Sequence, residues 1–242
     1  MVNVDRVYQK VLALANKEQR GYITPQDFNL FANQAQMEIF EQYFYDVNIA
    51  RKGQGNDTVY ADVDDMLEEK LQIFEKTEDA STYAAGVSTP ASILLPNYIY
   101  RVNKVFHLQA NKLITCEILN TKDFNEARYG GYLTRPTRSR PIANIHANEL
   151  LVAIEHDSIT NIGVRITFFK VPAKVNWAYI VMNNKAMYNE GGGDVHFQLH
   201  RSEETNLVNK ILKLAGISIK QQDVAQSGQG MEASTIQQQP KI

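Results

Sequence analysis

The organisation of this chain is clearest in residues 194–216, DVHFQLHRSEETNLVNKILKLAG. Its first seven residues alternate apolar and polar side chains, which predicts a half-buried strand. Ser202 then suits a helix N-cap, Glu203 and Glu204 bring negative charge to the first turn, and apolar residues recur on one face. Gly216 is typical of a left-handed cap that ends a helix. The stretch predicts a strand followed by an amphipathic helix that needs an apolar partner.

The N-terminal third of the chain offers that partner, because it predicts three helices. Apolar residues recur at helical spacing from Val4 to Ala15, and Thr24 with Pro25 forms a clear start for the second helix. After the glycine-containing run RKGQGND, a third helix has its apolar face between Val63 and Phe74. The apolar residues of the second helix cover more than one narrow stripe, so either a central place in a bundle or a binding surface explains them. We name four of them as subunit-interface candidates: Phe31, Phe40, Tyr43 and Phe44.

Between these helices the pattern changes to short runs of β-branched and aromatic residues separated by Pro, Asn and Gly. Few helix-length segments separate the runs, which favours an antiparallel sheet. The exception is residues 120–144, which could begin with a helical turn and then form a long loop. We therefore predict an α+β fold. It consists of a four-helix bundle (1–80 and 201–216), an inserted antiparallel β domain (87–200) with a long loop (120–144), and an extended C-terminal arm (217–242).

The arm has a composition that does not favour independent folding. Seven of the residues between 217 and 242 are Gln, and the apolar residues follow no helical or strand period. Such a segment buries too little surface to offset its ordering entropy. We interpret it as a docking arm held by a neighbouring molecule, although packing on its own domain would also order it. The candidate anchors in the arm are Ile219, Val224, Met231 and Ile236.

Composition limits the classes of protein that fit. The net charge of −2 removes the simplest argument for nucleic-acid binding by the whole chain. The single cysteine, Cys116, lies in the alternating run KLITCEIL, so we expect a free core thiol and a reducing compartment. No apolar run approaches the length of a membrane span, and the N-terminus lacks the layout of a secretory signal. We expect a soluble protein made in a cytoplasm.

Charge is unevenly distributed along the chain. Eight acids against two lysines lie between Asp62 and Asp79, and four arginines without an acid lie between 128 and 140. The arginines, interleaved with tyrosines, suit contacts with carboxylates or phosphates of a partner. We favour a protein partner, because single-strand binding usually shows a broader basic groove, while a solvated loop without a partner remains open. The candidate loop contacts are Arg128, Arg135, Arg138 and Arg140.

No catalytic motif is present, and we predict no catalytic, metal or cofactor site. Asp194, His196 and His200 would share one face of a strand, but the two histidines would lie too far apart to bind one zinc ion. The adjacent Glu155, His156 and Asp157 are more typical of a turn than of acid–base catalysis. The glycine run 191–193 suits a flexible connection better than a phosphate site.

Two blocks of the chain carry a family resemblance. They are VNVDRVYQKVLALANKEQRGYITPQDFNLFANQAQMEIFEQYF, residues 2–44, and DVHFQLHRSEETNLVNKILKLAGISIKQQDVAQ, residues 194–226. Together they resemble structural proteins of tailed bacteriophages, crAss-like and other podovirus-type phages above all. The likeness is to the head-to-tail connector proteins, also called adaptor or ring proteins. It covers both ends of the chain and little of its middle.

The resemblance implies a non-enzymatic virion protein at the head-tail junction, synthesised in the host cytoplasm. It implies a homo-oligomeric ring, commonly dodecameric, that binds the portal protein and the next ring or a tail or nozzle protein. Genomic DNA would pass through the ring without sequence-specific contact, and no membrane is involved. Exposed acids would repel DNA from the channel wall, and the candidates are Asp65, Glu68 and Glu69. Two alternatives stay open: another tail, nozzle or minor virion protein, and a nucleic-acid-binding accessory protein that uses the 128–140 loop.

Overall fold

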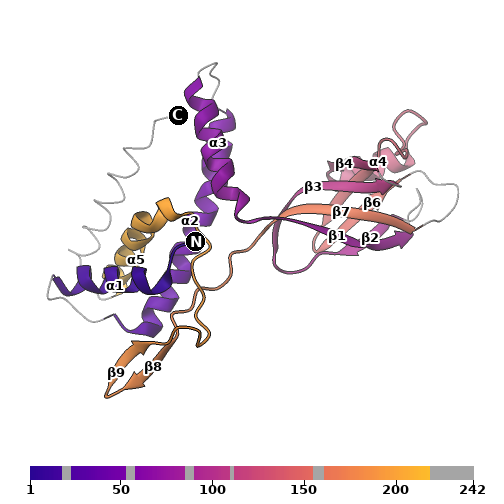
Figure 1. Ribbon diagram of the computed structural model, residues 1–242. Helices are drawn as coiled ribbons and strands as arrows, with labels where there is room; N and C mark the ends of the chain where they lie inside the picture. Colours follow the sequence, from indigo (N-terminus) through magenta and orange to yellow (C-terminus); the bar gives the residue numbers. More distant parts are fainter. Residues whose placement is uncertain (18–22, 53–57, 85–89, 110–111, 155–160, 219–242) are drawn as a thin grey trace. The chain divides into compact units, whose positions relative to one another are not determined.

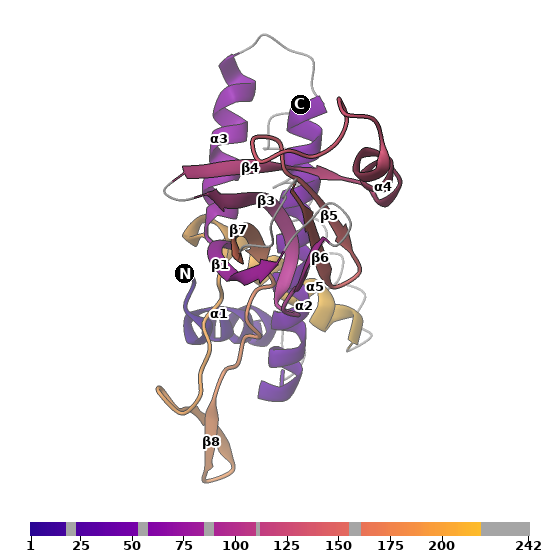
Figure 2. The same ribbon diagram turned by 90° about the vertical axis from the view of Figure 1, so that its right-hand side faces the viewer.

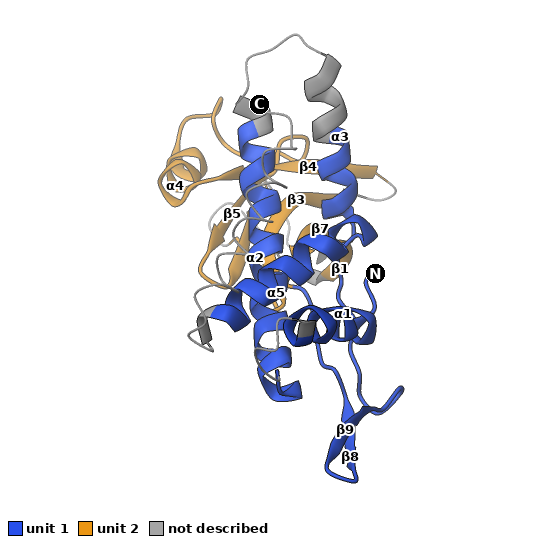
Figure 3. Cartoon of the chain, turned by 90° about the vertical axis from the view of Figure 1, so that its left-hand side faces the viewer, with its two compact units in different colours: residues 1–73, 172–242 blue, residues 74–171 orange. Residues whose placement is uncertain are grey.

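The computed structural model describes residues 1–17, 23–52, 58–84, 90–109, 112–154 and 161–218. The chain divides into two compact units (Figure 3). Unit 1 comprises residues 1–73 and 172–242, and unit 2 comprises residues 74–171. Residues 172–200, which the sequence placed in the inserted β domain, therefore belong to the unit that contains both chain ends.

Four α-helices belong to unit 1 (Figure 1): α1 (Val4–Lys17), α2 (Pro25–Lys52), α3 (Thr58–Gln72) and α5 (Glu204–Ser218). The longest, α2, contacts both α3 and α5, and α1 contacts α5. The predicted cap of α2 is confirmed, because Thr24 Oγ1 accepts the N–H of Asp27 at 3.2 Å and Pro25 is the first helical residue. At α1 the corresponding acceptor is Asn3, whose Oδ1 accepts the N–H of Arg6 at 3.0 Å.

The predicted ends of the last helix are displaced. His200 Nδ1 accepts the N–H of Ser202 at 3.4 Å, and a short 3₁₀ turn, η1 (Arg201–Glu203), comes before α5. The α-helix starts at Glu204, so Ser202 is not its N-cap. Gly216 is buried within the helix, which continues to Ser218, so it is not a left-handed cap.

The predicted strand over residues 194–200 is wrong. The backbone there makes only isolated bridges, Val2 to Phe197 and Asn176 to Val195. The N–H of Gln198 donates to the side-chain oxygen of Gln36 on α2 at 3.0 Å. A side-chain amide of a helix therefore occupies the place that the backbone of a neighbouring strand would have. Burial nevertheless alternates over residues 196–200, because Phe197 and Leu199 are fully buried and the residues on either side of them are half-buried.

Unit 1 also contains a two-stranded antiparallel hairpin, β8 (Tyr179–Met182) and β9 (Lys185–Tyr188). Asn183 and Asn184 connect the strands with φ of 51° and 61°. Two successive residues at positive φ are the signature of a type I′ turn, whose twist matches that of the strands, and Asn tolerates this conformation well.

Unit 2 is built around a seven-stranded sheet in the order β1-β7-β3-β4-β5-β6-β2. Its elements are β1 (Glu75–Ala84), β2 (Ala91–Leu94), β3 (Ile99–Gln109), β4 (Lys112–Leu119), α4 (Thr121–Tyr129), β5 (Ile142–His146), β6 (Glu149–Ala153) and β7 (Asn161–Lys170). All neighbouring pairs are antiparallel except β4 and β5, which are parallel. The parallel pair is possible because α4 and the loop after it provide the crossover.

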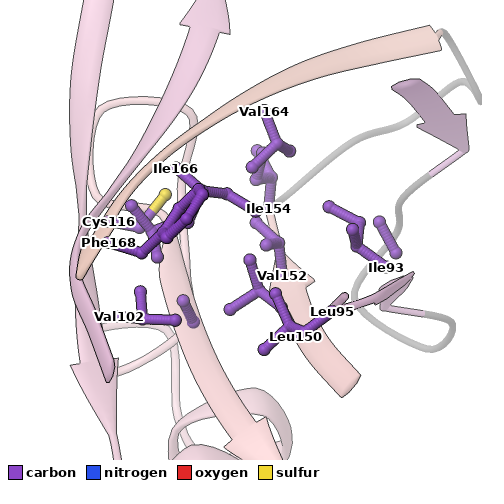
Figure 4. Close-up of a cluster of buried hydrophobic side chains, with 13 residues drawn as sticks. Ile93, Leu95, Val102, Cys116, Leu150, Val152, Ile154, Val164, Ile166 and Phe168 are labelled. Atoms are coloured by element: carbon purple, nitrogen blue, oxygen red, sulfur yellow. The ribbon is translucent and has the colours of Figure 1, made fainter. Parts of the chain in front are cut away.

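The sheet of unit 2 curls around its own core. Its two outer strands, β1 and β2, also contact each other. A cluster of 13 buried residues, Phe168 and Ile154 among them, fills the interior (Figure 4). On the outside, α4 lies against β4 and β5 (Figure 2), where Phe124 packs with Ile142 and Ala153. The curl removes apolar surface from water without a covering layer of helices.

The predicted fold class, a four-helix bundle with an inserted antiparallel β domain, is therefore wrong. The described residues form five α-helices, one of which lies in unit 2, and a large curled sheet of mixed direction. A second sheet, the β8–β9 hairpin, belongs to the helical unit. The error has a physical source: side-chain amides of α2 bind an extended segment of chain, a pairing that apolar periodicity does not reveal.

Candidate functional surfaces

The β8–β9 hairpin exposes large apolar side chains along most of its length. Val181 is 67 % exposed, and Ile180, Met182 and Met187 are about half exposed. An isolated two-stranded hairpin is marginally stable in water, and contiguous exposed apolar surface marks interaction sites. The sequence predicted short β runs in this part of the chain but not the exposure of this one. The Asn183–Asn184 pair between two short apolar runs was the available signal for a hairpin.

A rigid aromatic base holds this hairpin. Trp177 is buried, and its ring stacks on Tyr179 and Tyr188, with centroids 5.7 and 5.8 Å away. Tyr8 of α1 lies against the same indole at 4.2 Å, and the Trp177 Nε1–H donates to Asp5 Oδ1 at 2.9 Å. Stacked aromatic pairs add stabilisation beyond their buried area, so the root of the hairpin is fixed to α1.

A ladder of amide side chains on α2 positions the backbone next to Trp177. Asn33 Oδ1 accepts the N–H of Val175 at 2.8 Å, and its Nδ2 donates to the Val175 carbonyl at 2.9 Å. Asn29 accepts the N–H of Trp177 at 2.8 Å, and Gln36 donates to the carbonyl of Ala173 at 2.9 Å. The three amides recur one helical turn apart, so one face of α2 acts as a strand neighbour. That spacing was visible in the sequence, but it also suits a solvated face.

Asp194 closes the loop that follows the hairpin. It accepts the Tyr188 hydroxyl at 2.7 Å and the N–H of Gly191 at 2.8 Å, and these bonds lower the pKa of the Asp194 carboxyl. Burial, and then the Asp194 carboxylate, raise the pKa of Tyr188. Gly191 and Gly193 have φ of 76° and 93°, which favours glycine. The glycine run is thus a turn centred on a carboxylate, an unfavourable surrounding for a phosphate.

Asp194 and the two histidines after it do not converge on one point. His196 Nε2 lies 3.9 Å from Asp194 Oδ2, whereas His200 bonds the Ser202 hydroxyl at the start of η1. In the part of the chain that the structure describes, no group of three His, Cys, Asp or Glu side chains could hold a metal ion. Glu155, His156 and Asp157 lie outside the described residues.

The basic loop, residues 128–140, exposes two apolar side chains almost completely. Tyr132 is 92 % exposed and Leu133 is 91 % exposed. Arg135 donates from Nε to the Gly130 carbonyl at 3.0 Å, and its guanidinium lies over the Tyr132 ring at 5.4 Å. These contacts and a backbone pairing of Thr137 with Arg140 give the loop a defined shape. It is a preorganised surface of aromatic, aliphatic and cationic groups.

The four arginines of the basic loop fall into different environments. Arg128 lies in the last turn of α4, where it is buried with its guanidinium over the Phe124 ring at 5.5 Å. Arg135, Arg138 and Arg140 are exposed. For the last two, the described residues provide no side-chain hydrogen bond or ion pair.

The acidic run divides between the two units. In unit 1, Asp65, Glu68 and Glu69 are exposed on α3, next to Met66, which is 60 % exposed. In unit 2 the acids of β1 already have partners. Asp79 pairs with Arg165, whose hydrogen bonds lower the pKa of the Asp79 carboxyl. Glu78 accepts a hydrogen bond from the Tyr98 hydroxyl at 2.8 Å. Glu75 accepts one from the side-chain amide of Asn103 at 2.9 Å.

The four subunit-interface candidates on α2 do not share one surface. Phe40 and Tyr43 are buried inside unit 1, and Phe31 and Phe44 are half-buried. The candidate anchors of the arm, Ile219, Val224, Met231 and Ile236, lie outside the described residues.

Tyr43 belongs to a buried polar cluster where α2, α3 and η1 meet. Lys70 Nζ lies 2.7 Å from Glu203 Oε1 and 5.6 Å from the centre of the Tyr43 ring. Burial, then the charge of Glu203, raises the pKa of Tyr43, and burial also raises the pKa of Asp46. The cluster is nearly closed to water, so it suits a structural role for the ion pair.

A groove of about 750 Å³ lies in unit 2 at the start of β3. Its walls mix apolar side chains with three asparagines, and Arg101 is the one charged side chain among the residues that line it. Among the residues that line the groove, the ionisable side chains are those of Tyr100 and Arg101.

The interior of the curled sheet holds two reactive residue types in unreactive form. Cys116 is buried and free, as predicted, and burial raises the pKa of its thiol to about 12. His107 is also buried, and burial, with a smaller effect from the charge of Arg138, lowers the pKa of its imidazole. Both groups stay uncharged at neutral pH, which is typical of a core.

No protein-family model matches this chain, and no curated protein is significantly similar to it. Of the helices that the structure describes, none has both the length and the apolar character that crossing a bilayer requires.

Proposed function

We propose that this protein is a non-enzymatic structural subunit of a tailed-phage virion, a head-to-tail adaptor that links the capsid to the tail. Copies of the chain form a ring, dodecameric by analogy with the connectors that the sequence resembles, beneath the portal. Genomic DNA passes through the ring, and the protein is located at the head-tail junction. The proposal rests on the resemblance of both chain ends to phage connectors and on one structural observation, the exposed apolar hairpin.

The β8–β9 hairpin supports assembly better than it supports any other role. Four large apolar side chains are presented on an element that is rooted in Trp177 and α1. A preorganised element loses little conformational entropy when it docks, so its buried apolar area contributes efficiently to binding. A chain that acted alone would be exposed to aggregation through such a surface. A permanent neighbour, such as the next component of a tail, covers it.

The hairpin gives a direct test in the particle. Val181→Ser together with Met182→Ser removes apolar surface at exposed positions, so the fold should remain intact. Phage that depend on the altered gene should accumulate filled heads without tails, counted by electron microscopy. Lys185→Ser, an exposed position on β9 of the same hairpin, is the matched control and should leave tail joining unchanged.

Particles that assemble normally with the double substitution would remove the structural support for the proposal. A cryo-EM map of the intact particle would then decide the position of the subunit. Density below the portal is the expected result. Density in the nozzle, the tail tube or the head would favour the alternative, another structural protein of the virion.

The nucleic-acid-binding alternative has its own supporting observation. Arg138, Arg140 and Tyr132 are all exposed in the same loop, and these residue types are able to contact phosphates and stack on a base. Binding of a fluorescent single-stranded oligonucleotide should be measured against salt concentration. An affinity that falls steeply with salt and disappears in Arg138→Gln with Arg140→Gln would favour this role over the adaptor role.

A further inference from the structure

The basic loop and the outer face of α3 have complementary surfaces. On the loop, the nearly fully exposed Tyr132 and Leu133 lie close in sequence to Arg138 and Arg140. On α3, the exposed Met66 lies between Asp65 and Glu69, which are one helical turn apart and therefore neighbours on one face. Each surface therefore combines exposed apolar side chains with exposed charges of one sign.

Several other exposed charges of the described residues already have partners. The acids of β1 are bound to Arg165, Tyr98 and Asn103 within unit 2. On α1, Arg6 and Lys10 pair with Glu204. Within the described ranges, by contrast, no hydrogen bond or ion pair involves the side chains of Asp65, Glu69, Arg138 or Arg140.

We infer that the basic loop of one copy binds the acidic face of α3 in a second copy of this chain. Charge complementarity favours a second copy as the partner. In this contact two guanidinium groups meet two carboxylates, and Tyr132 and Leu133 cover Met66. Tyrosine and arginine dominate the energetic centres of protein interfaces. Leu133 has no planar face to stack on a base, so the full surface fits a protein better than a nucleic acid.

The pairing joins two different surfaces, so it is heterologous. A heterologous contact continues from copy to copy and closes into a ring when the rotation per copy allows it. The inference shares one assumption with the proposed function: copies of the chain associate with one another. It also changes the expectation for Asp65 and Glu69, which would face a neighbouring subunit instead of lining a DNA channel.

Charge reversal tests the contact on the purified full-length protein. Variant one carries Arg138→Glu and Arg140→Glu, and variant two carries Asp65→Lys and Glu69→Lys. Sedimentation velocity over a range of concentrations should show that the wild type associates, more weakly as ionic strength rises to about 0.5 M. Each variant alone should associate about tenfold more weakly or worse, because attraction becomes repulsion. An equimolar mixture of the two variants should associate again.

Matched controls reverse the same number of exposed charges elsewhere. Lys104→Glu with Lys112→Glu controls for variant one, and Glu41→Lys with Glu117→Lys controls for variant two. Both should associate as the wild type does, and all variants should keep the wild-type circular dichroism spectrum because the altered side chains are exposed.

The possible outcomes separate the contact from the proposed function. Unchanged association in both variants would overturn this contact and leave a ring with other interfaces. Weak association that is not restored by mixing would show that the two surfaces do not face each other, and would also overturn it. A wild type that stays monomeric at every concentration and salt would overturn the contact and count against the ring. Oligonucleotide binding that is lost in variant one, with self-association intact, would assign the loop to nucleic acid instead.

Discussion

Asn33→Ala should destabilise unit 1 far more than its position on a helix surface would suggest. The side chain of Asn33 accepts the N–H of Val175 at 2.8 Å and donates to the carbonyl of the same residue at 2.9 Å. Val175 is only 2 % exposed, so alanine leaves a buried N–H and a buried C=O without their partners. Each such group costs about 1–3 kcal/mol, and since some water can enter we expect a total loss of about 2–4 kcal/mol.

The assay uses the fact that Trp177 is the single tryptophan of the chain and lies in the segment that Asn33 holds. Urea unfolding followed by tryptophan fluorescence therefore reports on unit 1. With a slope of about 2 kcal/mol per M, the midpoint should fall by about 1–2 M urea.

Two further variants separate the ladder from a general effect of mutating α2. Gln34→Ala removes an exposed bond to Glu38 on the same helix and should cost about 0.2–0.5 kcal/mol. Asn33→Asp keeps an acceptor for the Val175 N–H but places a carboxylate against the Val175 carbonyl. Its deficit should shrink as the pH falls, because a protonated carboxyl can donate. A midpoint for Asn33→Ala no lower than that of Gln34→Ala would refute the reasoning.

Three other perturbations test the buried polar cluster and the thiol. Lys70→Met leaves the buried carboxylate of Glu203 without its cation and should lower the free energy of unfolding, measured by urea titration, by about 3 kcal/mol. The double variant Lys70→Met with Glu203→Gln should recover part of that loss. Burial raises the pKa of Asp46 above 3.8. Between pH 3.8 and the raised pKa, the folded state therefore binds more protons than the unfolded state, and the free energy of unfolding falls as the pH rises through this range. Asp46→Asn should therefore raise the melting temperature at pH 7 and lose this advantage below pH 3.8; equal effects at both pH values would contradict the assignment. Cys116, whose thiol has a pKa of about 12, should resist a thiol-reactive dye at pH 8 in the native protein and react fully in urea, and fast native labelling would contradict its burial.

Local chemistry explains which parts of the fold were predictable. Thr24 and Pro25 start α2 as expected, because a cap depends on atoms within one turn of the chain. The burial of Cys116 followed from the alternating run around it. The start of α5 was missed at Ser202, since His200 Nδ1 accepts the N–H of Ser202 and caps the 3₁₀ turn η1, so that the α-helix begins only at Glu204.

The candidate surfaces were only partly predictable for a different reason. Four arginines read alike in the sequence, yet Arg128 is buried in the last turn of α4 and the other three are exposed. The apolar run of β8 reads like any core strand, although its side chains face solvent. Whether a residue is buried depends on what packs against it, and for these residues the neighbours are distant in sequence.

The sequence by itself determined the start of α2, the approximate extents of most helices, the change to β structure in the middle of the chain, and the charged stretches. These depend on interactions between residues close in the chain. Only the tertiary structure decided that α4 makes the β4–β5 pair parallel, that the sheet curls on its own core, and that amides of α2 hold the segment before the β8–β9 hairpin. Each of these pairings joins groups that are far apart in sequence, and for such pairs the residue pattern specifies the chemistry but not the neighbour.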